Sequence, residues 1–130
     1  MTRSRRRGRR ARRAGRRAER IAERFLRRRG LETLARNYAK PWGEIDLVMR
    51  DEAVLVFVEV RLRGPGAWED GAASVDPAKQ RRLSRTADAW LREHPRYASD
   101  ASRFDVVSMS GTHFFSSKEW IADAFCADRG

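Results

Sequence analysis

Apolar residues recur at helical spacing near the start of the chain, behind a strongly basic N-terminal segment. From Ala14 they fall at i, i+4, i+7, i+8, i+11 and i+12, and Gly30 follows the last of them. This periodicity predicts a helix with one apolar stripe that ends at Gly30. Residues 1–13 carry no apolar stripe, so we expect them to form a disordered, Arg-rich tail outside the folded domain.

Strand-like patterns follow this helix. Residues 31–38 form the first predicted strand, and the sequence KPWG at residues 40–43 is a turn. Residues 44–50 and 53–61 are two further strands, joined by Asp51 and Glu52 in a short hairpin. The Gly-rich residues 62–75 have no periodicity and are expected to form a long loop beside the end of the third strand.

The second half of the chain predicts another helix and a return to the sheet. Asp76 and Pro77 are suited to begin a helix, which ends before Pro95 and is apolar on one face at Leu83, Ala87, Trp90 and Leu91. A strand over residues 103–109, a short irregular or strand segment, and a last helix that opens with a capping box at residues 116–119 and runs through Phe125 complete the pattern.

This order, α-β-β-β-α-β-(β)-α, predicts an α/β domain. Because a helix joins the strands at residues 53–61 and 103–109, the central sheet should be mixed and flanked by helices. We expect a single domain over residues 14–126 and a C-terminal tail at residues 127–130. The chain has 130 residues, which leaves no room for a second catalytic domain.

The charge is concentrated at the N-terminus. Residues 1–29 contain fifteen Arg and two Glu, a charge of +13, whereas the whole chain carries +11. No apolar run is long enough for a signal peptide core or a membrane span, so we expect a soluble protein without a membrane partner. The only cysteine is Cys126, which excludes an internal disulfide and suits a cytoplasmic location.

The predicted hairpin carries charge inside its apolar runs. Glu44 and Asp46 should share one strand face while Ile45 and Leu47 take the other, and Glu59 should share a face with Arg61. If the hairpin pairs through its short turn, Asp46 and Glu59 come together, where they repel each other unless a cation lies between them. Mg²⁺ or Mn²⁺ would suit these carboxylates. Spacing alone equally allows salt bridges at the strand ends.

Several segments of the chain resemble the YraN-like family of uncharacterised proteins, which are predicted to share a restriction-endonuclease-like fold with archaeal Holliday junction resolvases. The matching segments are AERIAERFLRRRG at 18–30, LARN at 34–37, GEIDLV at 43–48, VFVEVRLR at 56–63, Lys79, and RFDVV at 103–107. The resemblance implies a restriction-endonuclease-like core that acts on nucleic acid, expected to be DNA, with Mg²⁺ or Mn²⁺ as cofactor.

The resemblance also implies roles for individual residues. Asp46 and Glu59 would be metal ligands, Glu44 an auxiliary acid, and Glu19 a further acid at the edge of the site; an exposed helix charge is the alternative for Glu19. Relatives usually have Lys where this chain has Arg61, and Arg cannot give up a proton. Lys79 on the following helix is then a candidate for the missing ammonium, or an ordinary surface lysine.

Basic and aromatic residues outside this site are candidates for nucleic-acid contact. Trp42 and Trp68 lie in loops beside the hairpin, where Trp can stack on bases or anchor the loop. The basic candidates are Arg5, Arg6, Arg7, Arg9, Arg10, Arg12 and Arg13 in the tail and Arg81, Arg82 and Arg85 in the second helix. The alternatives are a bias of composition for the tail and an ordinary solvated face for the second helix.

These observations predict a metal-dependent endodeoxyribonuclease, or a nucleic-acid-binding protein that keeps the nuclease fold without turnover. A protein-interaction module with purely structural acids is a third hypothesis. Cutting of branched DNA would favour a homodimer with two sites.

Overall fold

The fold is a mixed five-stranded sheet with one helix on each face. The computed structural model describes residues 3–62, 75–110 and 117–126, with side chains from Gly15 onwards. Its elements are α1 (Arg3–Arg27), β1 (Glu32–Lys40), β2 (Gly43–Asp51), β3 (Val54–Leu62), α2 (Pro77–Glu93), the 3-10 turn η1 (Pro95–Tyr97), β4 (Ser102–Ser110) and β5 (Ser117–Phe125). The predicted α/β class, with a mixed sheet flanked by helices, is confirmed.

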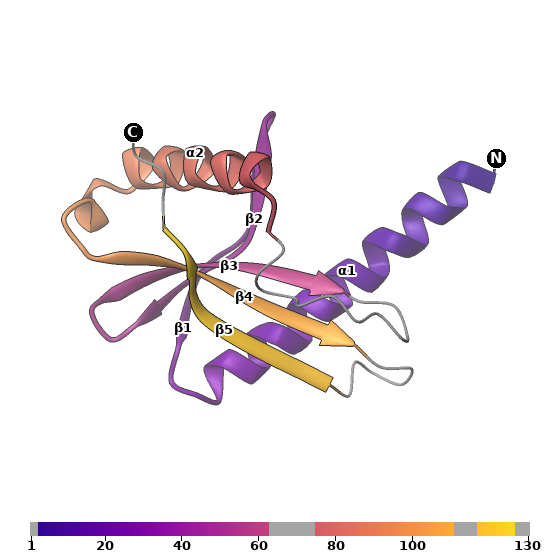
Figure 1. The fold of residues 1–130 in the computed structure, drawn as a ribbon, viewed down its shortest axis with the longest axis horizontal. Helices are drawn as coiled ribbons and strands as arrows, with labels where there is room; N and C mark the ends of the chain where they lie inside the picture. The colour runs from indigo at the N-terminus through magenta and orange to yellow at the C-terminus, as the bar shows by residue number, and fades with distance from the viewer. Residues whose placement is uncertain (1–2, 63–74, 111–116, 127–130) are drawn as a thin grey trace.

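The strands lie in sequence order, β1-β2-β3-β4-β5. Neighbouring strands are antiparallel except for β3 and β4, which are parallel because α2 carries the chain back across the sheet. Figure 1 shows α2 covering one face of the sheet and α1 crossing the other.

Two apolar clusters, one on each face, hold the helices to the sheet. Alternate residues of the strands enter different clusters, as the two-residue period of a strand requires. On the α2 face, Phe57 packs edge-on against Trp90, with ring centroids 6.0 Å apart. On the α1 face, Ala18, Ala22 and Leu26 are fully buried against β2, β3 and β4.

Helix α1 begins earlier than its apolar pattern does. The pattern begins at Ala14, but the helical backbone begins at Arg3, where the sequence predicts disorder. Arg and Ala have high helix propensities, so a segment without an apolar face can still continue a helix. This N-terminal part extends past the edge of the sheet (Figure 1). The division of the chain into tail and domain stays a prediction. In the part of the chain that the structure describes, no helix is long and apolar enough to cross a membrane.

The predicted last helix is wrong, because residues 117–125 form β5 along the edge of β4. Trp120 packs in the α1 cluster, whereas Phe125 stacks on Phe104 in the α2 cluster, with ring centroids 4.7 Å apart. A helix could not pair with β4 and would leave the edge of that strand without hydrogen-bonding partners. Tertiary packing therefore overrides the capping-box pattern.

Candidate functional site at the fork between two strands

The strands β2 and β3 separate partway along their length. They pair from Asp51 and Val54 at the turn as far as Leu47 and Val58. Beyond that point β2 stays paired with β1, whereas β3 stays paired with β4. Figure 1 shows β2 bending towards α2 while β3 continues beside β4. The two strands thus form a fork, with Asp46 and Glu59 as the first residues beyond the last pair.

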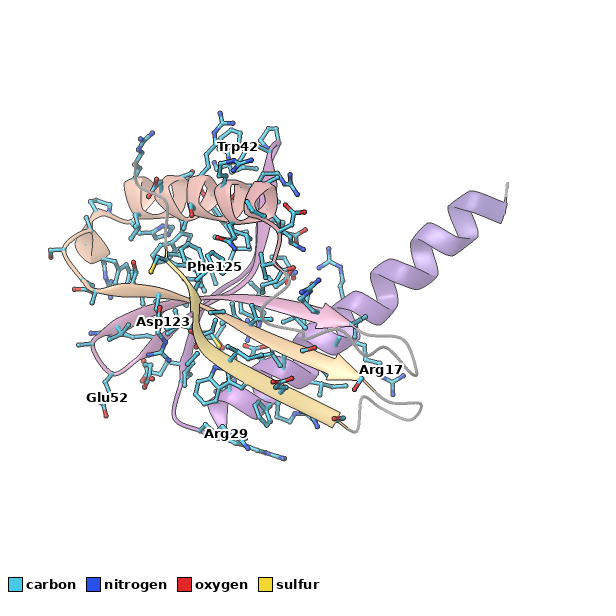
Figure 2. The ribbon with its side chains drawn as sticks, in the orientation of Figure 1. Arg17, Arg29, Trp42, Glu52, Asp123 and Phe125 are labelled. Atoms are coloured by element: carbon cyan, nitrogen blue, oxygen red, sulfur yellow. The ribbon has the colours of Figure 1, made fainter. Side chains whose placement is uncertain are left out.

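The tip of the bent strand is anchored on α2. A Cβ atom on Gly43 would come within 2.8 Å of Thr86 Oγ1 and 3.4 Å of the Arg82 carbonyl oxygen, so only glycine fits this approach. Trp42 lies beside α2 in Figure 2, and the guanidinium of Arg85 stacks 4.0 Å from its ring. Trp42 therefore anchors the turn, while Trp68 lies outside the described residues.

The side chain of Asp46 spans the gap between the two separated strands. One of its carboxylate oxygens accepts a hydrogen bond from the Val60 backbone amide at 2.8 Å, in place of a ladder partner. The regular alternation of β2 breaks here: Ile45 packs on the α2 face but Leu47 packs on the α1 face. The prediction that Ile45 and Leu47 share a face is therefore wrong, and the irregularity lies at Asp46.

Three acids meet at the fork. Ligand atoms of Glu19, Glu44 and Asp46 all lie within 4.8 Å of one another, which places Glu19 beside the two acids of β2. Its role as a further acid of the site stays a prediction. Asn37 links two of them, since its amide nitrogen donates to Glu19 at 2.5 Å and to Glu44 at 3.3 Å. Its amide oxygen accepts from Arg16 at 3.0 Å.

Glu59 is not one of these three acids, although its charge acts on Asp46. Its carboxylate forms an ion pair with Lys79 of α2 at 2.6 Å and is only 8% exposed. Burial raises the pKa of Glu59, although the hydrogen bond and charge of Lys79 and the charge of Arg61 oppose the rise. The structure thus brings Lys79 to the site, and the assignment of Glu59 and Asp46 as joint metal ligands stays a prediction.

The electrostatics of the fork favour an added positive charge. Burial and, after it, the charge of Glu59 raise the pKa of Asp46 from 3.8 to about 8, with further contributions from Glu19 and Glu44, while the hydrogen bond from Val60 opposes the rise. At neutral pH the metal-free cluster therefore holds a proton that an isolated aspartate would release.

The predicted basic contacts lie on two separate surfaces. Arg81, Arg82 and Arg85 are exposed on α2. The backbone of the N-terminal arginines belongs to α1, but their side chains, from Arg5 to Arg13, lie outside the described side chains. Contact of either group with nucleic acid stays a prediction.

Sequence reasoning missed the residue that organises the acids. Asn37 has a positive φ of 50°, a conformation that asparagine tolerates better than most residues. An asparagine within a strand-like segment is itself unusual, because asparagine is depleted in strands. That signal was available, but it does not say which side chains Asn37 contacts.

Comparison with known proteins shows curated relatives that match more than three quarters of this chain and of their own lengths. A UPF0102 protein of Halorhodospira halophila is 48% identical over 101 residues, covering 78% of this chain and 77% of the relative. A UPF0102 protein of Ralstonia nicotianae is 51% identical over 106 residues, covering 78% of each. One from Pseudomonas entomophila is 43% identical over 101 residues, covering 77% and 82%.

The family model matches residues 18–109. This range begins at Ala18, a buried residue within α1, ends one residue before the end of β4, and includes the whole fork. The chain therefore belongs to the uncharacterised protein family UPF0102, as its resemblance to YraN-like proteins predicted.

Proposed function

We propose that this protein is a metal-dependent, nuclease-like protein that acts on nucleic acid, DNA above all, at the fork between β2 and β3. The convergence of Glu19, Glu44 and Asp46 within 4.8 Å carries the proposal. Helix α1 supplies Glu19 and strand β2 supplies Glu44 and Asp46, at the point where β2 leaves β3. A purely structural role would not require three carboxylates to share one point.

The donor atoms suit a hard divalent cation. All of them are carboxylate oxygens, the ligands that Mg²⁺ and Mn²⁺ prefer, and Glu44 is exposed, which leaves room for water ligands. Glu19, Glu44 and Asp46 would hold the ion, with Glu59 on the facing strand. A bound ion would stabilise negative charge on a phosphodiester oxygen and lower the pKa of a coordinated water.

The remaining residues position charge around that point. Asn37 holds Glu19 and Glu44 in place through one amide group. Lys79 brings an ammonium group within 2.6 Å of Glu59, on the side of the fork where relatives would carry Lys in place of Arg61. Arg61 keeps a permanent charge that can neutralise a phosphate but cannot shuttle a proton.

One observation favours the second candidate, a nucleic-acid-binding protein without turnover. The Glu59 carboxylate is already engaged by Lys79, and Arg61 replaces the titratable lysine. In that case Lys79 would neutralise an acid that no longer has a catalytic role.

Metal binding and cleavage distinguish these two candidates. We would titrate Mn²⁺ calorimetrically into wild type, Glu44→Gln and a control, Glu119→Gln, which removes an exposed acid on β5. Loss of half or more of the affinity in Glu44→Gln alone is expected, because one of three close carboxylates is neutralised. Wild-type protein that binds no Mn²⁺ would overturn the metal site.

Cleavage would be followed on single-stranded, duplex and four-way-junction DNA, with a chelator control. Arg61→Lys should raise metal-dependent cleavage, whereas Glu59→Gln should abolish it and spare binding. Cleavage by wild type that is lost in Lys79→Ala would assign the ammonium role to Lys79. Binding without cleavage in every protein, including Arg61→Lys, would establish the second candidate.

A further inference from the structure

Two adjoining hollows follow α1 beside the fork. One, of about 480 Å³, is lined by Arg20, Glu23, Arg24, Arg27 and Arg28. The other, of about 160 Å³, lies between α1 and the first two strands and is lined by Arg16, Glu19, Arg20, Glu23, Arg36, Asn37 and Leu47. Arg20 and Glu23 line both hollows. They therefore form one groove, which we call the α1 groove, with Glu19 of the acid cluster at one end.

The α1 groove is strongly basic. Six arginines line it against two glutamates, and all six arginine side chains are exposed. Arg16, Arg20 and Arg24 recur every four residues of α1, so their backbone positions lie about 6 Å apart along the helix axis, and Arg28 follows just past the end of the helix. This is a row of cations and not a single anion pocket.

The two acids in the groove do not cancel this charge. Glu23 is 7% exposed and is neutralised by Arg36, which forms an ion pair with it at 2.7 Å, while Thr33 donates a hydrogen bond at 2.5 Å. Glu19 faces Asn37 at the fork. Among the residues that the structure describes, Arg20, Arg24 and Arg28 form no ion pair, so they are available to an anion from outside.

We infer that the α1 groove binds the phosphate backbone of one nucleic-acid strand and leads it to the acids at the fork. The inference rests on the proposed function, and it assigns substrate binding to a surface different from the α2 arginines. A linear row of guanidinium groups matches a linear polyanion, since arginine binds phosphate oxygens through its planar fork of donors. The backbone could belong to a single strand or to one strand of a duplex.

The test compares two double variants that remove equal charge. Arg20→Gln/Arg24→Gln changes the groove, and Arg92→Gln/Arg96→Gln changes exposed arginines at the end of α2 and in η1. Glutamine preserves helix propensity, so both should fold like wild type, which circular dichroism would check. Binding of fluorescent single-stranded and duplex oligonucleotides of one sequence would be measured by anisotropy, with EDTA present.

We expect the groove variant to bind on the order of tenfold more weakly, with the salt dependence reduced by about 1.4 in log–log slope for single strands, and the control to match wild type. The oligonucleotide with the larger loss identifies the form of the strand. Equal weakening in both variants, or none in either, would overturn the inference. So would equal competition by poly-glutamate at the same charge concentration, because it would show a site for acidic peptides.

Failure of the proposed function would look different. Binding in EDTA requires neither metal nor cleavage, so a protein without turnover could still show loss confined to the groove variant. Conversely, metal-dependent cleavage that is unchanged in the groove variant would overturn the α1 groove alone.

Discussion

Asp46→Asn should make the metal-free protein more stable at alkaline pH. Asp46 has a pKa raised from 3.8 to about 8, so between those pH values the folded protein keeps a proton that the unfolded chain releases. The folded state then binds more protons than the unfolded state, and the free energy of unfolding falls as the pH rises from about 4 to about 8. Above that window the full destabilisation is present. Asparagine removes the charge but can still accept the hydrogen bond from Val60.

The magnitude follows from the shift. Each pKa unit corresponds to about 1.4 kcal/mol, so a shift of this size sets an upper limit of roughly 6 kcal/mol. Asp46 is only partly buried, and the pKa of its neighbour Glu59 is raised as well, so deleting the charge of Asp46 relieves less than the full shift. We expect the advantage of the variant to grow by about 2 kcal/mol between pH 5 and pH 9, or about 10 °C in Tm.

Urea denaturation in EDTA, followed by tryptophan fluorescence at pH 5, 7 and 9, would measure this difference. Asp88→Asn, a half-buried acid on α2 outside the fork, is the control for a lost carboxylate. A difference between Asp46→Asn and wild type that does not change with pH would refute the reasoning. So would a variant that is less stable at pH 9, because the hydrogen bond to Val60 would then outweigh the repulsion.

Three other changes test the framework around the fork. Asp105→Ala should cost about 3 kcal/mol in urea denaturation, because this fully buried acid accepts hydrogen bonds from Arg103, Trp120 and the Asp123 amide; a loss below 1 kcal/mol would contradict that role. Gly43→Ala should lower Tm by the equivalent of about 1 kcal/mol, and an unchanged Tm would show that α2 yields. Burial opposes ionisation of Glu23, but its hydrogen-bonding partners lower its pKa below 4.5, so the stability lost in Glu23→Gln should be largest at pH 7 and shrink as the pH falls below 4.5; a loss that stays constant as the pH is lowered would count against it.

The local part of the fold could be predicted from the sequence. Helix α2 begins where Asp76 predicts, and the Asp76 carboxylate accepts hydrogen bonds from the Ala78 and Lys79 amides. The first three strands lie close to their predicted ranges, although the alternation of β2 breaks at Asp46, because each pattern depends on neighbours within a few residues. The C-terminal segment could not be predicted in this way, since its strand form depends on pairing with β4, whose partner residues lie between 7 (Ser110 and Ser117) and 21 (Phe104 and Phe125) positions earlier in the chain.

The candidate site, like the fold, could be predicted only in part from the sequence. Its acids could be named from the hairpin and the family resemblance, but their grouping could not, because it depends on the register at which β2 leaves β3. Spacing alone pairs Asp46 with Glu59, whereas the described structure gathers Asp46 with Glu19 and Glu44 and gives Glu59 to Lys79. A side chain such as Asn37 acts here only through this three-dimensional placement.

The hydrogen bond from Val60 to Asp46 has a consequence for how this family can diverge. Position 46 serves the backbone as well as the acid cluster, because the open fork leaves the Val60 amide without a ladder partner. A descendant that lost metal chemistry would still be selected for an oxygen acceptor there, so aspartate or asparagine should persist at that position. Glu44 is exposed, and among the described residues its side chain accepts a hydrogen bond from the side chain of Asn37 and none from a backbone amide. Under the proposed function, a family member that had lost metal binding should therefore show a substitution at Glu44 before one at Asp46.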